Sequence, residues 1–282
     1  MSGSTSTGRS RISEAGPADR VRQVVVIVTA VAAIAGALIG SGAFGGTAIA
    51  DAAGGALSAD ATLIAPAGSA FSIWSVIYLG LVAYTVWQAF PGQGSRPVHR
   101  GVGYWVAASL ALNAAWIGSV QAGLIGLSVV VIVALLAVLC IAFVILRRAP
   151  DDASGAAAVT DTIVIDGTIG LYLGWVSIAT AANITAWLTA IGFTGGGIPA
   201  DAWAIAVVAV AGLVGVATAI WGGGRLTPAI ALSWGLCWIA VARSTGSPSS
   251  SVVAIAAVIA VVVVLACAVV VRVRIVRQHA TA

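Results

Sequence analysis

Long runs of apolar residues, separated by short polar segments, recur along the whole chain. Each run is long enough to cross the ~30 Å of hydrocarbon in a bilayer as a helix, where backbone groups find partners only inside the helix itself. We therefore predict an all-α integral membrane protein with eight spans. They lie at residues 23–45, 67–90, 102–121, 124–146, 164–191, 203–221, 227–243 and 251–271, and the seventh is the shortest.

Composition supports this class. The chain has 282 residues, of which 60% are hydrophobic and 8% are charged, and its mean hydropathy is +1.09. A soluble domain carries far more charge, so a soluble globular protein is excluded.

The charges fix an expected orientation. The chain has thirteen arginines and no lysine. With eight spans, Arg243 alone lies on one side, and by the positive-inside rule the other side is cytoplasmic and holds both termini. The net charge of +4 thus reports topology and not nucleic-acid binding, and we expect a multi-pass protein of a bacterial cytoplasmic membrane. The twelve arginines of the basic side are Arg9, Arg11, Arg20, Arg22, Arg96, Arg100, Arg147, Arg148, Arg225, Arg272, Arg274 and Arg277, whereas Asp51, Asp60 and Asp201 lie opposite.

The N-terminal region allows two interpretations. Residues 1–22 are expected to form a disordered cytoplasmic tail. The apolar run Val24–Leu38, followed by Ala48-Ile49-Ala50, fits a cleaved signal peptide. A retained helix is favoured, because small residues four apart let helix backbones approach closely. These residues are Ala32, Gly36 and Gly40.

Catalytic and metal-binding patterns are sparse in the sequence. Cys140, Cys237 and Cys267 are scattered through the spans, which disfavours disulfides and zinc. His99 and His279 are expected in cytoplasmic segments. No phosphate-binding loop, nucleophile elbow or zinc-protease motif is present, so an enzyme is left open but is not favoured.

The fifth span carries an unusual stripe of polar and aromatic residues. Helical spacing places Tyr172, Trp175, Ala179, Asn183 and Trp187 on one face. Such a stripe suits a flat apolar ligand that needs a hydrogen bond. Ordinary helix–helix contacts use the same residue types, and spacing alone favours that alternative.

Two other spans carry similar faces. Trp105, Ser109, Asn113 and Trp116 share a face in the third span. The predicted topology places the polar and aromatic faces of the second, third and fifth spans at similar depths in the membrane. They can therefore meet in one cavity that opens toward the extracytoplasmic loop 46–66. The matching face of the second span consists of Phe71, Trp74 and Tyr78.

These motifs resemble a known family. Tyr172-Leu173-x-Trp175-Val176-x-x-Ala179-x-x-x-Asn183 is similar to the fifth-helix signature of the TspO/MBR family, the tryptophan-rich sensory proteins related to the peripheral benzodiazepine receptor. Leu110-Ala111-Leu112-Asn113-x-x-Trp116 resembles the third-helix motif, and Pro66 with the aromatic residues after it resembles the start of the second helix.

The resemblance covers residues 23–192 and implies a TspO-like five-helix bundle with a pocket beneath the first loop. Residues 193–271 would add three transmembrane helices, and residues 272–282 a basic cytoplasmic tail. Members of the family bind tetrapyrroles, and some bind sterols or synthetic aromatic ligands. Carried over to this chain, the ligand-binding residues are Phe71, Trp74, Tyr78, Asn113, Trp116, Tyr172, Trp175, Ala179 and Asn183.

The chain departs from the family in three places. Gly45–Ala65 holds no aromatic residue and no lysine, whereas the family usually has a Trp-Tyr pair and Lys-Pro there. Leu171 replaces the proline that commonly precedes the fifth-helix tyrosine, and Gly118 replaces the one that follows the third-helix tryptophan. The resemblance of the scaffold survives these changes. They affect which ligand the resemblance implies, because the usual first-loop aromatic residues are missing.

We therefore expect a membrane receptor or carrier for a planar hydrophobic molecule, with a tetrapyrrole such as a porphyrin or haem as the favoured ligand and no required cofactor. The alternatives are a secondary transporter of a small hydrophobic solute and a pigment-degrading enzyme. Ion-coupled transport needs ionisable groups within the membrane, and Asp166 is the main one. The expected partners are the ligand and the lipid bilayer, and the sequence leaves a homodimer open.

Overall fold

The computed structural model describes residues 15–40, 47–149 and 153–280, and the regular structure in these ranges is helical throughout. The predicted all-α architecture is therefore confirmed for the described residues. Arg9, Arg11 and the end of the first predicted span lie outside them. The long helices are α1 (Pro17–Gly40), α2 (Ile73–Ala89), α3 (Pro97–Gln121), α4 (Ile125–Arg148), α6 (Thr168–Ala190), α7 (Ala200–Trp221), α8 (Leu226–Thr245) and α9 (Ser251–Ala280).

Shorter elements connect these helices. The first loop contains the turns η1 (Ala52–Gly55) and η2 (Gly68–Ser72), and η2 leads directly into α2. The helix α5 (Gly155–Asp161) and the π-helical turn η3 (Thr162–Gly167) continue into α6, so the fifth predicted span begins nine residues earlier than expected. A short turn, η4 (Gly195–Gly197), precedes α7.

Seven helical segments in the described residues are long and apolar enough to cross a membrane. The remaining predicted span, 102–121, corresponds to α3, which is not among the seven. α3 is less apolar than the other spans because it carries polar residues such as Ser109 and Asn113. Both side chains are buried, since they face neighbouring helices inside the bundle. A multi-pass membrane protein is thus supported, and the count of eight spans stays a prediction.

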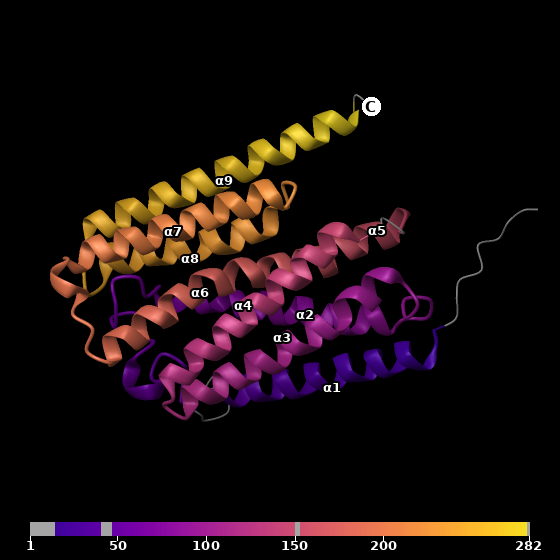
Figure 1. The fold of residues 1–282 in the computed structure, drawn as a ribbon, viewed down its shortest axis with the longest axis horizontal. Coiled ribbons are helices and arrows are strands. Elements are labelled where there is room, and N and C mark those ends of the chain that lie inside the picture. The colour runs from indigo at the N-terminus through magenta and orange to yellow at the C-terminus, as the bar shows by residue number, and fades with distance from the viewer. Residues whose placement is uncertain (1–14, 41–46, 150–152, 281–282) are drawn as a thin grey trace, which may run out of the picture.

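The helices lie roughly side by side, with α3 between α1 and α4 (Figure 1). At the centre, α6 contacts α2, α4 and α8, and α8 in turn packs against α7 and α9. More than half of the span containing α6 is buried, as expected for a helix with neighbours on several sides. This central helix carries the Tyr172–Asn183 stripe and joins the first helices to the last three.

The first helix starts earlier than the sequence suggested. Pro17 suits the first turn of a helix. Asp19 accepts hydrogen bonds from Arg22 at 2.9 Å and from both Nε and Nη2 of Arg100, at 2.8 and 2.7 Å. Arg22 also donates to the carbonyl oxygen of Gly94 at 2.7 Å. This charge network, in which Asp19 and Arg22 are buried and Arg100 is half-exposed, ties the start of α1 to α3, so residues 17–22 are helical instead of part of a disordered tail.

Close approach of small residues on α1 is confirmed in part. Gly36 lies against Ala114 and Gly40 against Ile117, both on α3. Ala32 is exposed, and its neighbour Ala33 is the buried residue. The first apolar run therefore packs as a helix of the bundle.

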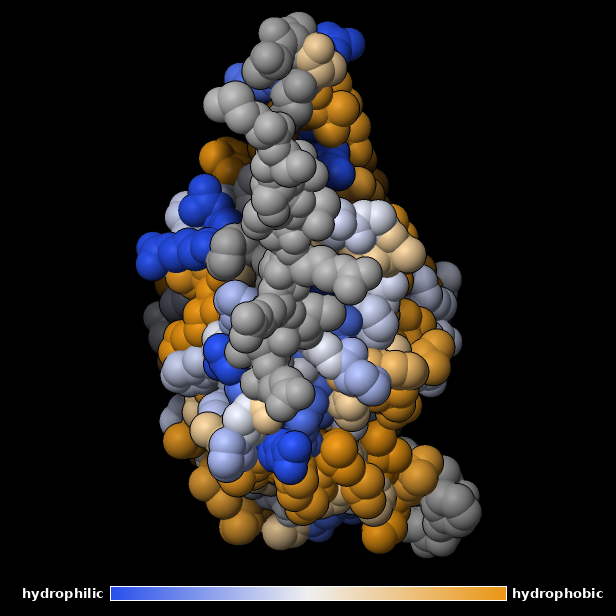
Figure 2. All heavy atoms as spheres, turned by 90° about the vertical axis from the view of Figure 1, so that its right-hand side faces the viewer, coloured by the Kyte–Doolittle hydropathy of each residue, from blue (hydrophilic) through white to orange (hydrophobic). Residues whose placement is uncertain are grey.

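Polar residues concentrate at one end of the bundle. Both ends of the described chain, the α2–α3 connection, the helix α5 and the α7–α8 connection lie at this end in Figure 1. Figure 2 views this end directly and shows hydrophilic residues gathered between apolar flanks. Arg243, near the end of α8, lies at the opposite end.

Reporter fusions test the predicted orientation. Fusions after residues 95, 150 and 282 should report a cytoplasmic location, and a fusion near residue 55 should report an extracytoplasmic one, because the arginines favour the cytoplasmic side. An extracytoplasmic C-terminus would show that one span, most simply the seventh, does not cross the membrane.

Candidate functional site

Five aromatic side chains from two helices and a turn form one cluster. Phe71 lies in η2, Trp74 and Tyr78 in α2, and Tyr172 and Trp175 in α6. The Trp74 ring lies 5.4 Å from Tyr78, 5.6 Å from Tyr172 and 6.3 Å from Trp175, measured between centroids. Phe71 meets Trp175 edge-on at 5.8 Å. Offset and edge-on arrangements of this kind are the favourable ones for aromatic pairs.

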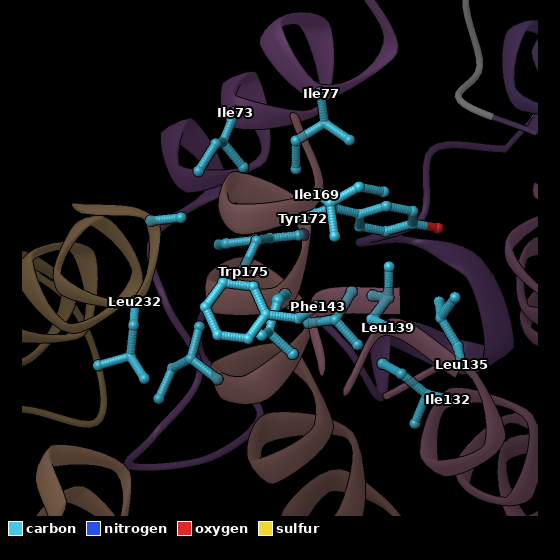
Figure 3. Packing of buried hydrophobic residues seen from close by; sticks show 14 of the residues in the cluster. Ile73, Ile77, Ile132, Leu135, Leu139, Phe143, Ile169, Tyr172, Trp175 and Leu232 are labelled. Atoms are coloured by element: carbon cyan, nitrogen blue, oxygen red, sulfur yellow. The ribbon is translucent and has the colours of Figure 1, made fainter. Parts of the chain in front are cut away.

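The helical repeat explains this convergence. Residues three or four apart share one helix face, so α2 and α6 each present two rings to the other. Figure 3 shows Tyr172 and Trp175 on α6, with Ile73 and Ile77 of α2 on one side and Ile132 of α4 on another. Aromatic residues of the second and fifth predicted spans thus meet as expected.

Asn183 occupies a separate polar junction of three helices. Its Oδ1 accepts a hydrogen bond from Trp116 Nε1 at 2.7 Å, and its Nδ2 donates to Ser128 Oγ at 3.0 Å. Asn183 is 1% exposed. Both ends of the amide are satisfied by the protein, so Asn183 holds α3, α4 and α6 together, as polar residues in membrane bundles commonly do.

Two other buried polar atoms at the cluster have no partner among the described residues. Asn113 Nδ2 donates to the hydroxyl oxygen of Tyr78 at 2.6 Å, but Asn113 Oδ1 accepts no hydrogen bond. Trp175 Nε1 likewise donates to nothing, although the residue is 1% exposed. An unmatched buried polar group costs about 1–3 kcal/mol, so such groups in a native protein call for a specific reason.

Both residues line a small cavity of about 40 Å³, and so does Thr62, whose buried hydroxyl oxygen also has no partner among the described residues. A larger cavity of about 530 Å³ lies between α1, α2 and α3 beneath residues 48–50. The two cavities adjoin, because four residues line both: Phe71, Trp74, Asn113 and Trp116.

Most of the residues predicted for the site come together here. Tyr78 lines the larger cavity. Tyr172 lines neither cavity: it is fully buried behind Trp74, and its hydroxyl donates to the Ser109 carbonyl oxygen at 3.4 Å. The others line the smaller cavity, namely Phe71, Trp74, Asn113, Trp116, Trp175, Ala179 and Asn183.

Sequence reasoning missed the residues that close the smaller cavity. Leu57, Thr62 and Pro66 of the first loop cover it, and Ile132 and Leu135 of α4 form a wall. The loop does this with small and aliphatic residues in place of the aromatic pair usual in the family. Pro66 was part of the second-helix motif, whereas nothing in the sequence distinguished the other four from similar residues of the chain.

The first loop is attached to α8. Arg243, which is 1% exposed, donates to the carbonyl oxygens of Ala59 at 2.5 Å and Pro248 at 2.7 Å. Trp234 Nε1 donates to the Ala70 carbonyl oxygen at 2.9 Å. Sequence analysis used Arg243 only as a topology marker, although its isolation on that side of the predicted topology could have indicated a local role.

Acidic charge in the loop supports the same attachment. The hydroxyl of Ser58 donates to the Asp60 carboxylate, which lowers the pKa of Asp60 below its usual value, and the charge of Arg243 lowers it further. Asp60 is therefore ionised at neutral pH and complements Arg243.

His99, which the sequence placed in a cytoplasmic segment before the third span, lies in the first turn of α3. It is fully buried, with Nε2 at 3.1 Å from Gln93 Oε1 and its ring beside Tyr84. This position is at the opposite end of α3 from Trp116. Among the described residues, no three His, Cys, Asp or Glu side chains are grouped as metal ligands.

The fold and the cavities define a helical membrane protein with an aromatic pocket between its helices. The TSPO-like protein family model matches residues 23–270, and the chain therefore belongs to the TSPO-like protein family. The match runs beyond the five helices that carry the sequence motifs and includes α7, α8 and most of α9. Comparison with curated proteins and with solved structures gives no match.

Proposed function

We propose that this protein is a membrane receptor or carrier that binds a planar hydrophobic molecule, with a tetrapyrrole as the favoured ligand, in the aromatic pocket between α2, α3 and α6. One observation carries the proposal: a buried donor, Trp175 Nε1, and a buried acceptor, Asn113 Oδ1, line the same apolar cavity without partners. A ligand that supplies one acceptor and one donor removes the cost of both.

The shape and chemistry of the pocket suit a flat ring system. Aromatic faces and edges surround it, and small-molecule sites typically combine such surfaces with a few placed polar groups. The larger cavity falls within the ~300–1,000 Å³ usual for small-molecule sites. A tetrapyrrole carries pyrrole N–H donors and imine nitrogen acceptors in one flat apolar ring, which matches the two unmatched atoms.

The smaller cavity is too tight for the whole ring. We propose that the ring occupies the larger cavity and reaches Trp175 through the shared wall, with Trp74 turning aside. Trp74 is only partly buried, so the larger cavity and its surroundings leave this side chain room to move.

Contacts at the fifth predicted span favour a receptor or carrier over an ion-coupled transporter. Asp166 lies in η3 and pairs with Arg225 at 3.5 Å. A carboxylate already paired with an arginine at a helix junction fits a role in packing, whereas proton coupling needs a group that changes its charge state.

Replacing Trp175 with phenylalanine should weaken porphyrin binding by about three- to tenfold, because the aromatic ring stays while one hydrogen bond to the ligand is lost. Trp175→Ala should weaken binding further, since ring contacts contribute about 0.5–1.5 kcal/mol. The measurement is an absorbance titration of purified protein with metal-free protoporphyrin.

Trp203→Phe is the matched control. Trp203 lies in the first turn of α7, 42% exposed, and donates to the carbonyl oxygen of Gly195. It lines neither pocket cavity, so its replacement should leave the affinity unchanged. Equal affinities for the Trp175 and Trp203 variants would show that the aromatic stripe serves packing alone.

A further inference from the structure

An open apolar groove runs along the outside of the bundle between α4 and α7. Its volume is about 560 Å³, and α6 forms its floor. The walls carry Cys140 and Phe143 from α4 and the exposed side chains Val210 and Val214 from α7. This groove is separate from the aromatic pocket, and an inference from it does not depend on the proposed function.

The groove has the length of a bilayer interior. Trp203 and Trp221 line its two ends, 42% and 40% exposed. Eighteen residues of helix separate them, which at about 1.5 Å per residue is about 27 Å. Hydrocarbon thickness is ~30 Å, and exposed tryptophans favour the two membrane interfaces. The apolar walls between them therefore face acyl chains.

Among the described residues that flank the groove, exposed arginines lie at the Trp221 end. The Arg147 guanidinium stacks on the Trp221 ring, with its carbon 4.4 Å from the ring centroid. Arg148 follows it, and both arginines are exposed. At the Trp203 end the nearby charged residue is Asp201, which accepts a hydrogen bond from Ser250 at 2.6 Å. The occupant must therefore be apolar along its length and negative at the Trp221 end.

We propose that this groove binds an anionic phospholipid, with its acyl chain along α4 and α7 and its phosphate at Arg147 and Arg148. Basic pockets beside membrane helices recognise anionic head groups in this way. Among described residues, the acidic side chains at this end of the bundle are already paired with arginines, so a second copy of the chain offers less complementary charge. These residues are Asp19, Asp161 and Asp166.

Native mass spectrometry of the full chain in detergent tests this site, with phosphatidylglycerol and phosphatidylcholine as probes. The wild type should retain one phosphatidylglycerol in preference to phosphatidylcholine. The double variant Arg147→Gln/Arg148→Gln should bind phosphatidylglycerol about tenfold more weakly. The matched control is Arg272→Gln/Arg274→Gln, which removes two exposed charges from α9 and should change affinity by less than about threefold.

Cysteine labelling of the wild-type protein tests the same site without any substitution, so its result does not depend on whether the variants fold. Cys140 lines the groove, whereas Cys237 is exposed on α8 outside it. Phosphatidylglycerol should slow maleimide labelling of Cys140 and leave Cys237 unaffected. Equal effects of both lipids on Cys140, or equal lipid loss in both double variants, would overturn the proposal. A dimer that Ala217→Phe converts to a monomer would overturn it in favour of a second copy, because Ala217 lines the groove.

Discussion

Gly174→Ala should lower the free energy of unfolding by about 1–3 kcal/mol, because an added methyl group overpacks a closed contact between α6 and α8. A Cβ at Gly174 would collide with the backbone carbonyl oxygen of Pro228, which cannot turn aside as a flexible side chain can. Gly170, one turn earlier, also approaches α8 closely, but a Cβ there would meet side-chain atoms of Thr227 and Pro228. Chemical unfolding in detergent micelles measures the loss.

Gly118→Ala is the matched control. Gly118 is exposed in α3, and a Cβ there would meet nothing within 4 Å. Alanine is the better helix former by about 1 kcal/mol, so this variant should be as stable as the wild type or more stable. If Gly174→Ala behaves like Gly118→Ala, the close α6–α8 contact is not part of the native packing.

Arg243→Met should also be strongly destabilising, by about 2–4 kcal/mol, because a buried arginine loses two charge-assisted hydrogen bonds to backbone carbonyl oxygens while the aliphatic stem is kept. Since Arg243 holds Ala59, backbone amides of the first loop should exchange with solvent faster than in the wild type. Hydrogen exchange of residues 47–66 measures this effect.

Ser244→Ala serves as the control for Arg243. Ser244 is the next residue, is exposed and bonds only its own helix, at the Ala240 carbonyl oxygen. Its loss should cost less than about 0.5 kcal/mol. If the amide hydrogen exchange rates of the first loop are unchanged in Arg243→Met, the loop that covers the smaller cavity does not depend on α8 for its stability.

The helices themselves were predictable from the sequence. Each of the eight predicted spans contains a long helix, because uninterrupted apolar runs in a membrane leave the backbone no other way to satisfy its polar groups. The meeting of Trp74, Asn113 and Trp175 was predictable as well. Each lies on a helix face with other polar or aromatic residues, and such faces avoid lipid by turning inward.

The individual roles of site residues were not predictable. Asn183 resembled a ligand-binding amide, but its partners Trp116 and Ser128 belong to two other helices, and only the packing brings them to it. Tyr172 belongs to the aromatic cluster but lines neither cavity, and this too depends on how the helices pack. Periodicity gives the face of a helix but not the rotation and depth at which neighbouring helices meet it.

The partners of charged residues near the helix ends were not predictable from the sequence either. Hydropathy placed residues 17–22 in a polar tail, whereas Asp19 joins Arg22 and Arg100 in a buried network. Arg243 was counted as a topology marker, although it anchors the first loop. A charge that is neutralised by a distant partner cannot be told from a solvated one by local sequence.

We propose that a planar ring binds in the aromatic pocket through stacking, shape and two hydrogen bonds. Among described residues, no His, Met or Cys side chain lines either cavity. The Tyr78 hydroxyl is engaged by Asn113, so a haem iron there lacks its usual axial ligands.

The most direct test compares metal-free protoporphyrin with haem in parallel titrations of the wild type and Trp175→Phe. The account predicts saturable binding of both ligands with dissociation constants within about threefold of each other, because the iron adds no bond to the protein. Both should quench tryptophan fluorescence, and both should bind Trp175→Phe more weakly. A strong preference for haem, with an axially ligated spectrum that His99→Ala abolishes, would contradict the account and move the site to the opposite end of α3.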